Sequence, residues 1–142
     1  MYFQFIHIFN MAQERLIIYT DGSCSPNPGP GGWGFIAIFR DCEIHVNEGL
    51  KQTTNNVMEM TAVMQALKTF PKQKYFHVYS DSLYVINCAQ GIWQRKKNVE
   101  LWQEYDRLAK GKDIKYEWVK SHNNDYYNEL VDKLAKNGRP KT

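Results

Sequence analysis

Residues 16–34, LIIYTDGSCSPNPGPGGWG, constrain the fold more than any other stretch of this chain. The apolar start at residues 16–19 has the β-branched and aromatic side chains typical of a buried strand. The prolines and glycines of residues 26–32 then predict a tight, irregular turn before Trp33 begins a second apolar run. Asp21 therefore falls at the predicted end of a central strand, where a carboxylate is costly to bury without a positive partner.

The composition fits one globular domain of 142 residues, 43% hydrophobic and 23% charged. No stretch approaches the roughly 20 apolar residues of a membrane span, and the net charge of +3 permits nucleic-acid binding without establishing it. Cys24, Cys42 and Cys88 are scattered and form no CxxC pair. This pattern favours reduced thiols in a cytoplasmic compartment over a disulfide framework or a zinc site. We expect a cytoplasmic monomer.

The first ten residues, MYFQFIHIFN, differ in character from the rest of the chain. They are aromatic and apolar, and they lack the Lys or Arg of a signal peptide. We interpret residues 1–14 as a non-essential N-terminal extension, residues 15–138 as the folded domain and residues 139–142 as a tail. The alternative is that the aromatic segment packs along a sheet edge or in a dimer, so that its removal would cost stability or solubility.

Hydrophobic patterning predicts an α/β fold with a mixed five-stranded sheet and helices on its faces. Three successive strands should form an antiparallel meander, and the later strands, separated by helices, should pair in parallel. The predicted strands are residues 16–21, 35–40, 43–50, 75–81 and 114–119. The predicted helices are residues 55–70, 82–91, 98–110 and 126–137. The order is strand-strand-strand-helix-strand-helix-helix-strand-helix.

Four acidic residues occupy unusual positions in this pattern. Asp21 and Asp81 each end a predicted strand. Glu59 lies on the buried stripe of the first helix, and Asp132 borders the buried stripe of the last one. Each residue taken singly could be a cap, a salt bridge or a solvated group. No Arg or Lys falls on the buried stripes, so the four together cannot all ionise without cations. Carboxylates that bridge two hard divalent ions, Mg²⁺ or Mn²⁺, are the arrangement that cleaves phosphodiesters.

These residues lie in stretches that resemble type 1 ribonuclease H over nearly the whole chain, from about Arg15 to Ala135. The matching stretches, in order and at fitting spacing, are YTDGSCSPNPGPGGWG, TTNNVMEM, SDSLYV, NVELWQ and EWVKSHNNDYYNELVDKLA. The resemblance implies the ribonuclease H fold and endonucleolytic cleavage of the RNA strand of RNA–DNA hybrids. It also implies a two-metal-ion mechanism with Mg²⁺, or Mn²⁺ as a substitute, that leaves 5′-phosphate and 3′-hydroxyl ends.

The resemblance further implies roles for individual residues. The four metal-binding and catalytic acids of the family fall on Asp21, Glu59, Asp81 and Asp132. Substrate contacts in the minor groove or to a phosphate are implied for Cys24, Asn27, Thr54, Asn55, Asn56 and Ser82. Turn and cap chemistry is the plainer explanation for the asparagines, and they can serve both purposes.

The mobile-loop histidine of the family falls on His122, within the polar segment SHNND. A lone loop histidine is more often a solvated side chain. With a reference pKa near 6.5, an imidazole can carry a proton at working pH. We therefore expect His122 to assist proton transfer or product departure, while the metal ions provide most of the catalysis.

The chain departs from the family pattern in two places. Leu83 stands where the family often has Gln, so one groove contact is not expected. Well-studied bacterial members also carry a basic, Trp-rich protrusion between the second and third helices. Here only residues 92–97, IWQRKK, occupy that place. Arg95, Lys96 and Lys97 remain as a small basic cluster, for which a solvated turn is the alternative interpretation.

Two other functions are compatible with much of the same sequence. A retroviral-like domain without the protrusion would bind hybrids weakly and require a partner polymerase to be active. A transposase-like DNA nuclease of the same broad fold fits less well, because the TTNN segment points to RNA–DNA hybrids. Cleavage of a labelled hybrid by the purified chain distinguishes an independent enzyme from a polymerase-dependent domain.

Overall fold

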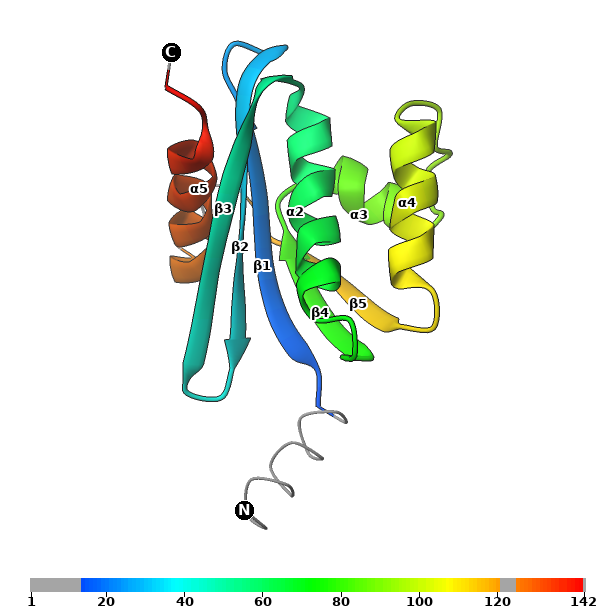
Figure 1. Ribbon diagram of the computed structural model, residues 1–142. Coiled ribbons are helices and arrows are strands. Elements are labelled where there is room, and N and C mark those ends of the chain that lie inside the picture. Colours follow the sequence, from blue (N-terminus) through cyan, green and yellow to red (C-terminus); the bar gives the residue numbers. More distant parts are fainter. Residues whose placement is uncertain (1–13, 121–124, 142) are drawn as a thin grey trace.

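The computed structural model describes residues 14–120 and 125–141 and has a five-stranded sheet with helices on both faces (Figure 1). The strands are β1 (Leu16–Cys24), β2 (Gly29–Phe39), β3 (Cys42–Thr53), β4 (Tyr75–Ser80) and β5 (Asp113–Trp118). The helices are α2 (Asn55–Thr69), α3 (Leu83–Ala89), α4 (Val99–Ala109) and α5 (Tyr126–Gly138). The order of elements confirms the prediction.

The sheet has the strand order β3-β2-β1-β4-β5. β1, β2 and β3 pair antiparallel, and β1, β4 and β5 pair in parallel, as predicted. Tyr19 of β1 lies opposite Tyr79 of β4. Asp21 and Asp81 each follow two residues later, so this register brings them to neighbouring positions at the same edge of the parallel pair.

The predicted turn after Asp21 was too long. β1 and β2 both extend into it, and residues 25–28 alone connect them, so Asp21 lies inside a strand and not at its end. The glycines serve a different purpose, because α5 packs directly on β2. A Cβ atom on Gly32 would lie 2.1 Å from the carbonyl oxygen of Ala135. Glycine is needed here for close approach of two backbones and not for turning.

Helix α2 is the central helix of the domain and lies against β1 and β2 (Figure 1). The Thr54 side chain caps it by accepting a hydrogen bond from the backbone N–H of Val57 at 3.2 Å. Its buried residues form the core with the sheet and with α3 and α4, and α5 covers β1, β2 and β3 on the other face. Within the ranges the structure describes, no helix is long and apolar enough to cross a membrane.

Arg95 ties the short connection between α3 and α4 to the domain. Its guanidinium pairs with the carboxylate of Asp106 at 2.7 Å, donates to the carbonyl of Cys88 at 2.9 Å and lies 4.7 Å from the ring centroid of Trp102. Arg95 therefore supports α4 and does not belong to a solvent-facing basic cluster. This corrects the prediction, which grouped it with the exposed residues Lys96 and Lys97.

Candidate active site

Four elements bring the predicted acids to one cleft. One carboxylate oxygen from each of Asp21, Glu59 and Asp81 lies within 4.8 Å of the other two. Asp132, from α5, lines the same cleft, which has a volume of about 340 Å³. We call these four residues the acidic cluster. Residues that are more than 100 positions apart in the chain thus share one site.

The close approach of β1 to α2 produces this grouping. A Cβ atom on Gly22 would lie 2.3 Å from the backbone nitrogen of Glu59 and 2.4 Å from the carbonyl carbon of Met58. The absence of a side chain at Gly22 therefore lets the helix backbone touch the strand. Glu59, 5% exposed, consequently lies beside Asp21, which accepts a hydrogen bond from the N–H of Gly22 at 2.9 Å.

The acidic cluster holds its carboxyl protons tightly. Burial is the main cause that raises the pKa of Asp21 to about 8, and repulsion from Asp81 is the next largest cause. Burial, followed by the charges of Asp21 and Asp81, raises the pKa of Glu59 well above its usual range. Without a cation, the protein therefore keeps part of the cluster protonated at neutral pH.

The donor set suits a hard divalent cation. Glu59 Oε2 is buried and has no hydrogen-bond partner among the described residues. An unpaired buried carboxylate oxygen is costly unless it binds an ion. Lys136 pairs with Asp132 at 3.0 Å, but this pair lies at the half-exposed rim and does not reach Glu59. Closely spaced carboxylate oxygens are the ligands that Mg²⁺ and Mn²⁺ prefer.

Trp118 supports the backbone of Asp81, a contact that the sequence analysis missed. Its indole N–H donates to the Asp81 carbonyl oxygen at 3.2 Å. On the other side, the N–H of Ser82 donates to Ser80 Oγ at 3.0 Å. The turn that carries Asp81 is therefore held from both sides. Strand periodicity gives no sign of this contact, because Trp118 lies at a strand end with 46% of its surface exposed.

Three of the predicted substrate residues line the cleft beside the acids: Cys24, Asn55 and Ser82. Ser23 lines it as well, although it was not predicted. The Cys24 thiol donates to the carbonyl oxygen of Thr53 at 3.4 Å, which links β1 to the end of β3, directly before α2. These side chains place polar groups at the entrance to the acidic cluster.

The other predicted substrate residues have local structural roles or lie off the cleft. Asn27 Oδ1 accepts from the N–H of Asn55 at 3.0 Å and ties the turn of residues 25–28 to α2. Thr54 is the N-cap of that helix. Asn56 is half-buried in its first turn and is not among the described residues that line the cleft. The turn chemistry predicted for the asparagines is therefore present at Asn27, and the cap of α2 is provided by Thr54.

The predicted His122 lies in residues 121–124, outside the described residues, and its role stays a prediction. The helix that follows is described. The Asp125 side chain caps α5 by accepting from the N–H of Asn128 at 2.9 Å. This cap fixes the start of the helix that carries Asp132.

Comparisons with known proteins identify the family of the chain. The sequence model of the RNase H family matches residues 13–139. A ribonuclease H from Wolbachia pipientis wMel is 42% identical over 142 residues, covering 89% of this chain and 96% of the relative. The N-terminal RNase H domain of a Mycobacterium tuberculosis protein has a TM-score of 0.78 at 26% identity, covering 87% of this chain and 92% of that one.

A further solved structure, LC11-RNase H1 in complex with an RNA/DNA hybrid, shares the fold, with a TM-score of 0.73 at 23% identity. The alignment covers 87% of this chain and 98% of that one. The family match spans the acidic cluster and all nine described elements. The chain therefore belongs to the ribonuclease H family of divalent-metal-dependent nucleases.

Proposed function

We propose that this protein hydrolyses the RNA strand of RNA–DNA hybrids, with divalent cations held by Asp21, Glu59, Asp81 and Asp132. The observation that carries the proposal is the group of three carboxylates within 4.8 Å, one of them with a buried, unpartnered oxygen. Family membership supports the hybrid as substrate, and so does the fold neighbour solved with such a hybrid.

Each acid has a distinct task in this proposal. Asp21, on β1, and Asp81, directly after the neighbouring parallel strand β4, would hold cations from the floor of the cleft, and Glu59 would supply a ligand from the helix side. Asp132 completes the set from the rim. Two Mg²⁺ ions, with Mn²⁺ as a substitute, would provide the Lewis acidity that activates water and stabilises the leaving 3′ oxygen. The products would carry 5′-phosphate and 3′-hydroxyl ends.

Proton release from the acidic cluster accompanies this binding. Asp21 has a pKa of about 8, so it gives up a proton when a cation takes its place. The neighbouring Lys136 keeps Asp132 oriented by pairing with Oδ2 at 3.0 Å. We propose that His122, ten positions before Asp132 in the chain, assists proton transfer or product departure.

The proposed substrate surface extends from the cleft along the start of α2. Cys24, Asn55 and Ser82 line the cleft, and Asn27 is hydrogen-bonded to Asn55. These polar groups suit the wide, shallow minor groove of a hybrid, which displays the RNA 2′-hydroxyls. We also assign a groove contact to Asn56 and a phosphate contact to Thr54.

We propose that residues 15–138 form the catalytic domain and that residues 139–142 are a tail without a catalytic role. The proposed state is a monomer in the cytoplasm. The free thiols of Cys24, Cys42 and Cys88 support a reducing compartment.

Cleavage of defined substrates tests the proposal. The purified chain, with Mg²⁺ or Mn²⁺, should cut the RNA strand of an end-labelled hybrid and leave duplex DNA and single-stranded RNA intact. Asp21→Asn should be inactive. Asp41→Asn, which changes an exposed acid at the turn between β2 and β3, is the matched control and should retain full activity. A native chain that leaves the hybrid uncut with both ions would overturn the proposal and favour the polymerase-dependent alternative.

A further inference from the structure

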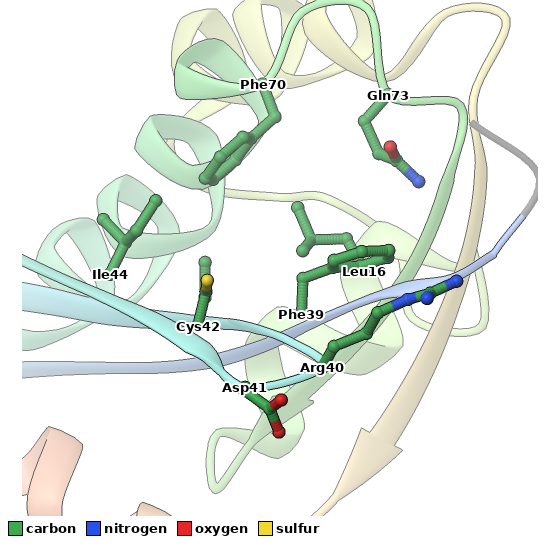
Figure 2. Close-up of a pocket in the computed structure, with 9 residues that line it drawn as sticks. Leu16, Phe39, Arg40, Asp41, Cys42, Ile44, Phe70 and Gln73 are labelled. Carbon is green, nitrogen blue, oxygen red and sulfur yellow. The ribbon is translucent and has the colours of Figure 1, made fainter. Parts of the chain in front are cut away.

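An apolar groove lies at the opposite end of β1 from the acidic cleft. Figure 2 shows Leu16, Phe39, Ile44 and Phe70 around a shared space, which has a volume of about 540 Å³. Ile44 has 46% of its surface exposed. Leu16 precedes Asp21 by five strand residues, or about 17 Å. The groove is therefore separate from the proposed catalytic site.

The chain that precedes β1 begins at the rim of this groove. Glu14 is held there from two sides. Its carboxylate accepts a hydrogen bond from the Arg40 guanidinium at 2.7 Å, and its backbone carbonyl accepts from the Gln73 amide at 2.7 Å. Arg40 and Gln73 both line the groove (Figure 2). Glu14 is consequently anchored, and the preceding residues start beside the apolar walls.

The composition of the preceding residues matches the groove. Residues 1–13, MYFQFIHIFNMAQ, contain no Asp, Glu, Lys or Arg and are mostly aromatic or aliphatic. Transfer of such a segment from water to an apolar surface is favourable, because it removes apolar side chains from contact with water. Because it is covalently attached next to the groove, its effective concentration there is in the millimolar range expected for a short linker. The concentration of a second copy of the chain is ordinarily lower than this effective concentration, so the attached segment is the favoured occupant.

We propose that the aromatic segment, residues 1–10, docks in this groove and covers Phe39, Ile44 and Phe70. The docked segment stabilises the end of the domain where β1 begins. Because the groove lies away from the acidic cluster, docking leaves catalysis unchanged. The N-terminal extension is therefore dispensable for cleavage but contributes to stability, and this inference does not depend on the proposed function.

Thermal unfolding of six chains tests the docking: the native sequence, Ile44→Glu and Leu50→Glu, each with and without residues 1–10. Removal of residues 1–10 should lower the Tm by about 5 °C, a shift that corresponds to roughly 1–2 kcal/mol for a chain of this size. Ile44→Glu, which places a charge in the groove, should lower the Tm of the full chain and have a much smaller effect on the truncated chain. Leu50→Glu is the matched control, because Leu50 is 51% exposed on the same strand and lies outside the groove. Its effect should be the same in both chains.

Cys42 provides a second, direct readout, because it lines the groove and its side chain is exposed. In the full chain a docked segment should slow alkylation of Cys42 severalfold relative to the truncated chain. Ile44→Glu should restore fast alkylation in the full chain, and Leu50→Glu should not. A Cys42→Ser chain identifies the signal, since Cys24 and Cys88 are also thiols.

Two results would contradict the docking proposal. Equal alkylation rates with and without residues 1–10 would overturn the proposal. Protection that disappears on dilution, together with the mass of a dimer at high concentration, would overturn it in favour of a second copy as the occupant. If the truncated chain does not fold, the comparison of Ile44→Glu with Leu50→Glu in the full chain still decides between a covered and an open groove.

Discussion

The charge of Asp21 depends strongly on its surroundings. Its folded-state pKa of about 8 exceeds the ordinary value of 3.8, mainly because it is buried. A raised carboxyl pKa adds stability that is fully present below the ordinary value and is lost as the pH rises through about 8. In the presence of a chelator, the native chain should therefore lose stability between pH 4 and pH 8.

Asp21→Asn tests this at the scale of one residue. The substitution removes the charge that becomes costly at high pH, so it should stabilise the metal-free chain at pH 8 by roughly 1–3 kcal/mol and flatten the pH dependence. Cleavage should be abolished. Urea unfolding in chelator at pH 5 and pH 8 measures the effect. A variant that is much less stable than the native chain at pH 8 would instead show that Asp21 has a structural role.

Trp118 has a measurable role if its indole N–H orients Asp81. Trp118→Phe keeps an aromatic ring and removes the donor that lies 3.2 Å from the Asp81 carbonyl. Loss of one hydrogen bond worth about 1 kcal/mol should lower kcat roughly fivefold. The Mg²⁺ concentration for half-maximal rate should rise, with the KM for hybrid unchanged. An unchanged kcat and an unchanged Mg²⁺ dependence would show that the Trp118 hydrogen bond does not position Asp81.

At the scale of elements, the contact between β2 and α5 positions Asp132. Gly32→Ala would place a Cβ atom 2.1 Å from the Ala135 carbonyl oxygen and 2.6 Å from the Arg139 nitrogen, both of them backbone atoms that cannot rotate away. We expect a loss of about 1–3 kcal/mol in the free energy of unfolding and reduced activity.

Gly34→Ala is the matched control on the same strand. Its nearest neighbours would be Leu134 Cγ at 3.1 Å and the backbone nitrogen of Ala135 at 3.2 Å, contacts that a shift of a few tenths of an ångström relieves. Chemical denaturation of both variants gives the comparison. A Gly34→Ala chain as unstable as Gly32→Ala would contradict the assignment of the strain to the much shorter contact at Gly32.

The same contact shows what the sequence could predict about the elements. Helix and strand periodicities differ, so the order of elements and the parallel pairing of the later strands were predictable. The role of the glycines after Asp21 was not predictable. A glycine can serve a turn or a close backbone contact, and the sequence alone does not distinguish the two. The close contact at Gly32 depends on Ala135 of α5, which is about 100 residues later in the chain.

The acids of the candidate site were predictable from the sequence, but the contacts that support them were not. Asp21, Glu59, Asp81 and Asp132 stood out because each lies at a position where an acid is unusual, and the structure places all four at one cleft. The contacts that support them were not predictable. The Trp118 hydrogen bond and the ion pair of Arg95 with Asp106 both depend on how separate elements pack.

At the scale of the whole molecule, the lack of a basic protrusion between α3 and α4 should lower the affinity for the hybrid. In the short connection before α4, Lys96 and Lys97 are exposed, whereas Arg95 is engaged with Asp106. Each phosphate contact adds about −0.9 to the slope of log affinity against log salt on duplex DNA. We therefore expect a high KM, a shallow salt slope and short residence on the hybrid.

A graft tests this expectation. A basic protrusion inserted in residues 93–97 should lower KM and steepen the salt slope, with little change in maximal rate. Cleavage kinetics at several salt concentrations, for native and grafted chains, provide the comparison. A native chain that already shows a steep slope would mean that another basic surface binds the hybrid, and Lys110 and Lys115 would be the first residues to replace.

Calorimetric titration with Mg²⁺ and Mn²⁺ at pH 7, in buffers of different ionisation enthalpy, tests the acidic cluster as a cation site most directly. The native chain should bind the cation and release protons, because Asp21 is still largely protonated at that pH. Asp21→Asn should bind more weakly and release fewer protons, and Asp41→Asn should behave as the native chain does. Binding that is unchanged in Asp21→Asn, or a native chain that binds neither ion, would contradict the assignment of this cluster as the metal site of a nuclease.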